Sequence, residues 1–259
     1  MTTLERTITS DRLLTTAGLV AMTAVAWIWL VREAARMNGM AANAQMHMAM
    51  GMADMRVWDA SAWLGLAIMW AVMMVAMMLP SAAPLIVLVL GVYRRRHTAQ
   101  ARLSAYAFLA GYLLAWTLFS AVAALAQVVM HRAAVMSPDM RVGSSVLASA
   151  VLIAAAVYQW LPIKNVCLTH CRSPFGFLSV HWREGMGGGL AMGLHHGLFC
   201  IGCCWLLMAL LFVVGVMNLL WVALLAALVF VEKLAPKGAL IGRAAGVGMA
   251  AWAIYLLAA

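Results

Sequence analysis

Long apolar runs separated by short polar segments dominate the sequence. A helix needs about 20 predominantly apolar residues to cross the hydrocarbon of a bilayer. The pattern predicts an all-α fold, a polytopic transmembrane helix bundle of about seven spans that forms one domain over residues 1–259. The runs occupy residues 12–31, 62–90, 103–130, 143–162, 189–212, 216–234 and 238–258. Because Pro236 and Lys237 leave little room between the last two runs, six spans with a terminal re-entrant segment are the alternative.

Composition supports a location in the lipid bilayer. The chain is 66% hydrophobic and only 10% charged, and its mean hydropathy is +0.98. The first apolar run could serve as a secretory signal, but Ala24 to Arg36 contains large residues and charge and lacks a small-x-small cleavage motif. We therefore expect this run to remain as a permanent span.

The basic residues are divided unequally between the two sides when the predicted spans alternate. With the N-terminus inside, twelve of the 17 Lys and Arg residues fall on the inner side and five on the outer side. Cytoplasmic loops carry the excess of Lys and Arg, so the pattern predicts a cytoplasmic N-terminus and, with seven spans, an exported C-terminus. The net charge of +9 follows from this topology. No DNA- or RNA-binding motif is present, and no nucleic-acid partner is expected.

The run at 189–212 contains metal-binding residue types where a span normally has apolar side chains. Ionisable groups at membrane depth are costly and are functional candidates by default. Thioether, imidazole and thiolate follow one another at helical spacing, because Met192, His196, Cys200 and Cys204 are each four residues apart. The candidate metal ligands of this run are Met192, His195, His196, Cys200, Cys203 and Cys204.

Two further stripes mark the apolar runs. Met69, Met73 and Met77 repeat every four residues in the second run, a spacing that by itself indicates adaptable packing. This run is antiparallel to the run at 189–212, so Met73 and Met77 would join a Met, His and Cys site if the two helices were neighbours. Glycines repeat at the same period in 189–197 and 238–246, which predicts close contact of these two helices with one another or with a partner subunit.

Two polar segments also contain soft ligands. We expect residues 32–61 to form a Met- and His-rich exported loop in which Met46, His47 and Met48 collect Cu(I); an interfacial segment with Met as a generic apolar residue is the alternative. We expect residues 163–188 to form a cytosolic loop that binds a metal ion through Cys167, His170, Cys171 and in some arrangements His181. A disulfide between Cys167 and Cys171 would become the better interpretation if the topology were inverted.

Several of these motifs occur together in a known family. The chain resembles bacterial integral membrane proteins described as predicted metal-binding proteins, and the resemblance covers roughly residues 60–258. The matching segments are Met73–Pro80 with Pro84, Cys167–Pro174, Gly193–Trp205, and Met217–Trp221 with Glu232 and Lys233. The resemblance implies a multi-span helical fold in the bacterial inner membrane and a metal site, but no reaction.

Ligand softness favours copper, with zinc as the second candidate, because thioethers and thiolates outnumber carboxylates. Two functions then compete. The first is copper handling, in which the chain binds, delivers or transfers copper through an intramembrane Met, His and Cys site. The second is a copper-dependent membrane oxidase or oxygenase, or a subunit of one, that acts on a hydrophobic substrate, with a second membrane or exported subunit completing the site. A scaffold subunit ranks third, and structural roles are expected for Glu232, Lys233 and Arg243.

Overall fold

The computed structural model describes residues 3–49, 60–96, 100–137 and 140–258. All the named elements of this part are helices, which confirms the all-α fold. Their bounds are α1 Thr3–Ala49, α2 Ala60–Arg95, α3 Ala101–Arg132, α4 Ser145–Tyr158, α5 Pro162–Arg172, α6 Pro174–His181, α7 Gly185–Ala209, α8 Leu211–Val214, α9 Leu219–Leu234 and α10 Gly238–Ala258.

The number of helices long enough to span a bilayer is smaller than the seven predicted. In the described residues, five helices have the length and apolar character of a span, and α4 with α5 makes a sixth if this pair, bent by 64°, is counted as one. The bend lies at Pro162, since the residue before a proline is driven out of the helical region. The predicted span at 216–234 becomes α9, which has 16 residues and begins after Gly215, where φ is +99°.

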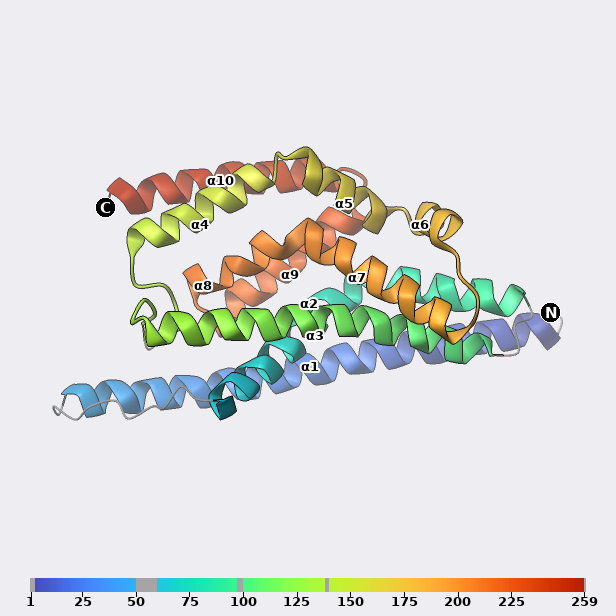
Figure 1. Ribbon diagram of the computed structural model, residues 1–259, viewed down its shortest axis with the longest axis horizontal. Coiled ribbons are helices and arrows are strands. Elements are labelled where there is room, and N and C mark those ends of the chain that lie inside the picture. Colours follow the sequence, from blue (N-terminus) through green and yellow to red (C-terminus); the bar gives the residue numbers. More distant parts are fainter. Residues whose placement is uncertain (1–2, 50–59, 97–99, 138–139, 259) are drawn as a thin grey trace.

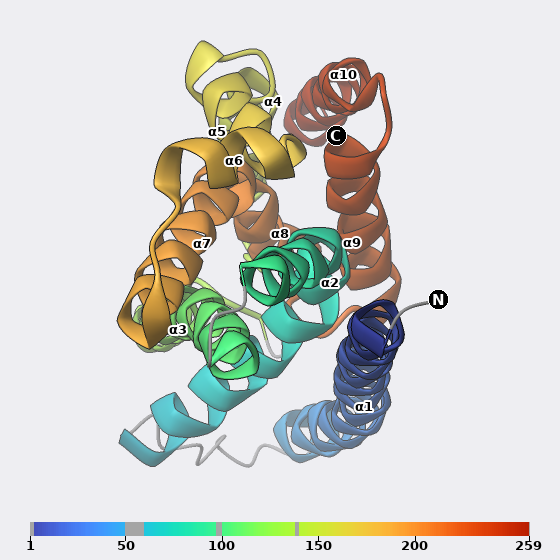
Figure 2. The same cartoon turned by 90° about the vertical axis from the view of Figure 1, so that its right-hand side faces the viewer.

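The central helix of the bundle is α2, which packs against α1, α3 and α9. Helix α7 packs along α3 and α5, while α4 packs along α10 on the far side of the molecule (Figures 1 and 2). The N- and C-termini lie at opposite ends of the long axis (Figure 1). This arrangement surrounds the middle of α7 with helices that come from distant parts of the sequence.

The glycines of α7 allow a close approach to α3. A Cβ atom at Gly193 would lie 1.9 Å from the carbonyl oxygen of Phe108, and one at Gly189 would lie 2.2 Å from that of Ser104. Gly111 of α3 is equally close to the backbone of α7, at 2.2 Å from the oxygen of Leu190. The glycines of α10 instead face Glu232 and Gln159. The predicted contact between the two glycine stripes is therefore wrong, because each stripe packs against another helix.

The two predicted loops are largely helical. Helix α1 continues through the Met-rich segment to Ala49, because Ala, Met and Gln are good helix formers. Residues 163–188 contain most of α5 and all of α6, and Pro162 and Pro174 each occupy the first turn of a helix, where the missing N–H costs nothing. Rather than remaining apart as a loop, α5 packs against α7.

Candidate metal centre

Packing of α5 on α7 brings together cysteines that the sequence separates by about thirty residues. The thiol of Cys171 interacts with those of Cys200 and Cys203. Cys200 and Cys203 are fully buried, whereas Cys171, on α5, is only partly buried. The predicted cytosolic cluster and the predicted intramembrane cluster therefore form one group of sulfur ligands.

The remaining two cysteines belong to the same neighbourhood. Cys204 interacts with Cys200 and Cys203 and donates its thiol to the carbonyl oxygen of Cys200, at 3.0 Å. Cys167 faces the glycine on α7 that precedes Cys203, since its sulfur lies 2.9 Å from where a Cβ of Gly202 would be. All five cysteines are free thiols. The disulfide between Cys167 and Cys171 that was the alternative interpretation is not formed.

Two side chains from other helices contact the sulfur of Cys200. The Lys233 ammonium group, on α9, lies 2.9 Å from this sulfur and 3.1 Å from the Ser81 hydroxyl of α2. The Tyr112 hydroxyl, on α3, lies 3.3 Å from the same sulfur and also bonds the carbonyl oxygen of Met78. A lysine ammonium group stabilises a thiolate, the form of cysteine that binds metals.

His196 lies one helical turn before Cys200. Its side chain is only 3% exposed and Nδ1 has no hydrogen-bond partner. The ring is held among the rings of Phe108, Tyr112 and Phe177, at centroid distances of 5.1 to 6.1 Å. Buried polar atoms normally have partners, so an orphaned imidazole nitrogen beside a group of thiols is suited to metal coordination.

The methionine stripe of α2 is near this centre but does not pack directly on α7 over an extended contact. Met73 and Met77 are fully buried, and Tyr112 and Lys233 stand between α2 and Cys200 by bonding to both sides. The side chain of Met192 is directed elsewhere, because its sulfur accepts the backbone N–H of Arg183 at 3.3 Å. The predicted neighbourhood of α2 and α7 is thus replaced by a contact through α3 and α9.

The charged pair at the end of α9 is buried, and its two members face different neighbours. Glu232 and Lys233 are both buried, and Glu232 accepts two hydrogen bonds from Lys164 of α5, at 2.8 and 2.9 Å. Gln159 also bonds to Lys164. The ion pair therefore ties α5 to α9 behind the cysteines, while Lys233 points toward them.

Sequence reasoning missed Lys233 and Tyr112, which contact Cys200, and Ser81, which contacts Lys233. A charged residue that follows a long apolar run is a weak signal, because many such residues extend to the membrane surface. Tyr112 and Ser81 carry no distinguishing spacing. Only the packing of α3 and α9 against α2 and α7 reveals their position.

The other predicted ligands lie apart from the cysteines. Met46 is exposed near the end of α1, and the side chains of His47 and Met48 lie outside the described residues. His170 and His195 contact His181 and Phe199. Among the described residues, no group of three or more His, Cys, Asp or Glu side chains is already arranged to hold a metal ion, so the thiols are neighbours rather than a preformed cage.

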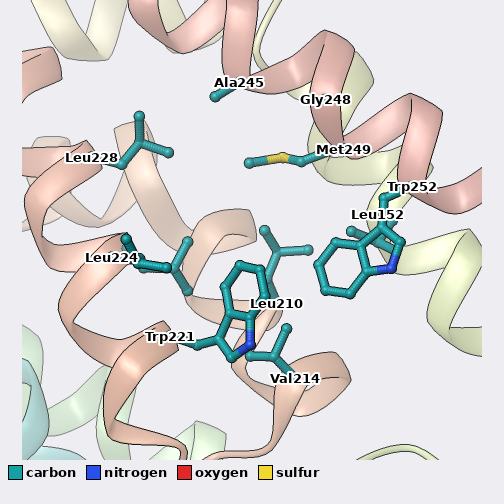
Figure 3. Close-up of a pocket in the computed structure, with 11 residues that line it drawn as sticks. Leu152, Leu210, Val214, Trp221, Leu224, Leu228, Ala245, Gly248, Met249 and Trp252 are labelled. Carbon is teal, nitrogen blue, oxygen red and sulfur yellow. The ribbon is translucent and has the colours of Figure 1, made fainter.

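An apolar cavity of 310 Å³ lies between α4, α9 and α10 (Figure 3). The indole rings of Trp221 and Trp252 stack in its wall with their centroids 5.1 Å apart. Aliphatic and aromatic side chains and Met249 line this cavity (Figure 3). None of the predicted metal ligands in the described part of the chain is among them. This cavity is therefore not part of the metal centre.

Comparison with known proteins places this geometry in a family. Neither a curated protein nor a solved structure matches the chain. A family model described as "PpoB2: Copper chaperone" matches residues 67–256, a range that contains all five cysteines, Tyr112, His196 and Lys233. Because the match covers most of the sequence, the chain belongs to this copper chaperone family.

Proposed function

We propose that this protein is a membrane-embedded copper carrier that binds Cu(I) between α5 and α7 and transfers it to a partner protein. The observation that carries the proposal is the convergence of Cys171, Cys200 and Cys203 beside Lys233. Thiolates are soft ligands that select Cu(I). Neighbouring thiols without a closed cage suit a carrier, because the ion must be released as well as bound.

Charge balance favours Cu(I) over a divalent ion. With Cys200 and Cys203 as thiolates and Cys171 as a neutral thiol, the two thiolates and one Cu(I) ion carry a net charge of −1, which the Lys233 ammonium group neutralises. The same two thiolates around Zn(II) are neutral and would leave the ammonium group buried without an opposite charge, which is costly. Lys164 does not alter this balance, since Glu232 already pairs with it.

The long apolar helices are compatible with membrane insertion, and we propose that the bundle lies in the bacterial inner membrane with its N-terminus in the cytoplasm. Arg94, Arg102 and Asp11 form ion pairs at the end of the bundle that holds the N-terminus, and the positive-inside rule assigns a basic end to the cytoplasm. The Met-rich end of α1 then lies on the exported side. There it would collect or pass Cu(I), and the recipient would be a second membrane protein or an exported protein.

Copper content of the purified protein tests this function. We expect near-stoichiometric Cu(I) in protein isolated from copper-supplemented cells and loss of that ion in the Cys200→Ser/Cys203→Ser variant. Ser120→Ala is the matched control, because this buried hydroxyl bonds only to the carbonyl of Trp116 in its own helix. Copper bound equally by the control, the cysteine variant and the parent protein would overturn the proposal, provided that all three elute as folded protein.

A further inference from the structure

Three histidines gather around Phe199 on the outer side of α7. His170 comes from α5, His181 from α6 and His195 from α7. The ring of His170 stacks on Phe199 with centroids 4.3 Å apart, and the ring of His195 lies 4.8 Å from the same phenyl ring. His181 lies 4.5 Å from His195 and 6.3 Å from His170, again between ring centroids. Each of the three helices thus supplies one imidazole to the group.

Backbone hydrogen bonds set the tautomers of two of these rings. Nδ1 of His170 lies 2.9 Å from the carbonyl oxygen of Val166, and Nδ1 of His181 lies 3.2 Å from that of Phe177. A carbonyl oxygen only accepts, so each Nδ1 must carry a proton. The lone pair of a neutral ring is then on Nε2, the arrangement by which proteins orient a histidine that binds a metal.

The group is open on one side. His181 and His195 line a cavity of 270 Å³ together with Trp182, Arg183 and Met192. The side chain of His195 is exposed. Among the described residues no three histidine side chains are already arranged to hold an ion, so the rings of this group must turn toward one another when they bind one. A small ion could therefore reach His181 and His195 from this cavity without opening the helix bundle.

The neighbouring residue links this group to the cysteines. His195 directly precedes His196, and the two side chains leave α7 in different directions, because successive residues on a helix are about 100° apart. His195 is exposed among the other histidines, whereas His196 is buried one turn from Cys200. The adjacent residues His195 and His196 thus lie between the outer imidazoles and the inner thiols.

We propose that His170, His181 and His195 form a second copper site, made of imidazoles alone, from which Cu(I) passes through His196 to Cys200. This inference rests on the proposed function, since it adds a second binding site that the ion occupies before or after the cysteine site. Imidazole binds copper in either common oxidation state. The transfer is an exchange of ligands on one ion and involves no change in oxidation state.

Anaerobic loading with Cu(I), followed by metal counting and X-ray absorption, tests the second site on the full-length protein in detergent. We expect His170→Ala/His181→Ala/His195→Ala to retain one copper fewer than the parent protein and to show weaker imidazole scattering. His131→Ala, at the end of α3, is the control and should retain both. If the triple variant does not fold, His195→Ala alone replaces it in the test, because it changes only an exposed side chain. We expect this single variant to weaken retention of the same ion at least tenfold.

The two proposals fail in different ways. An unchanged copper count and unchanged imidazole scattering in the histidine variants would overturn the second site and leave the cysteine site intact. Loss of both ions in Cys200→Ser/Cys203→Ser would also overturn it, because the two groups would then form one shared site. Absence of sulfur-bound copper from the parent protein would instead overturn the proposed function.

Discussion

The two buried lysines of this bundle have different partners. Lys164 is bonded by both carboxylate oxygens of Glu232 and by Gln159. Lys233 is bonded by the sulfur of Cys200 and the hydroxyl of Ser81. The first lysine is neutralised within a structural ion pair, whereas the second is neutralised only when negative charge resides on the sulfur cluster. The chemistry of the partner thus distinguishes a buried charge that holds helices together from one that faces the candidate metal ligands.

Adjacent positions on α9 produce this difference. Glu232 and Lys233 leave the helix about 100° apart, so one side chain faces α5 and the other faces α2 and α7. Exchange of the two residues would place a carboxylate against the thiols. Like charges in a buried setting are strongly unfavourable, and the order of the two residues therefore matters to the site.

The largest effect is expected from Lys164→Met, which leaves the Glu232 carboxylate buried without a cation. The free energy of unfolding should fall by about 3–5 kcal/mol, measured by denaturant unfolding in detergent. The double variant Lys164→Met/Glu232→Leu should recover most of this loss, because replacement of a buried pair by apolar side chains is often neutral. A double variant as unstable as the single one would show that the pair is not an isolated structural unit.

Lys233→Met should instead affect copper more than stability. Removal of a charge that supports a metal ligand costs about 10- to 100-fold in affinity, so retention of Cu(I) against a chelator should fall within this range. Lys233→Arg keeps the charge and should retain more copper than the Met variant.

The same pair of variants tests charge balance. The ratio of Zn(II) to Cu(I) affinity should rise in Lys233→Met, since a neutral dithiolate site no longer carries an unbalanced ammonium group. Equal loss of both metals would contradict the argument that Lys233 selects a monovalent ion.

Tyr112→Phe removes a hydroxyl that lies 3.3 Å from the sulfur of Cys200 and donates to the carbonyl oxygen of Met78, and leaves the packing of the ring unchanged. A single hydrogen bond contributes about 1 kcal/mol, which corresponds to roughly fivefold weaker binding of Cu(I). Competition with a Cu(I) chelator would detect this change. An effect as large as that of Lys233→Met would mean that the hydroxyl itself coordinates the ion.

Ser81→Ala should have the smallest effect. The Ser81 hydroxyl lies 3.1 Å from Lys233 but also donates to the carbonyl oxygen of Met78 in its own helix. Lys233 keeps its contact with Cys200 when this hydroxyl is removed, so we expect roughly twofold weaker retention of Cu(I). A loss above tenfold would show that Ser81 positions the ammonium group.

Much of the fold was predictable because helix formation depends on local pattern. The apolar runs that became α1, α2, α3, α7 and α10 were found close to their observed positions. The Met-rich segment was expected to be a loop because of its polar residues, but its described part up to Ala49 is helical. The Cys- and His-containing segment was also expected to be a loop, but Pro162 and Pro174 each begin a helix there. The run at 216–234 did form a helix, α9, but at 16 residues this helix is shorter than the predicted span, because composition does not show that the chain turns at Gly215 before the helix begins.

By itself, the sequence determined which residues are candidate ligands and which helix carries most of them. Imidazole and thiols within an apolar run are costly to bury, and this cost marked His196, Cys200 and Cys203 without any knowledge of their neighbours. Tertiary structure alone decided that Cys171 joins them and that Lys233 and Tyr112 contact Cys200. The reason is that spacing along one helix specifies which side chains share a face, whereas the facing partner depends on how helices from distant parts of the chain pack together.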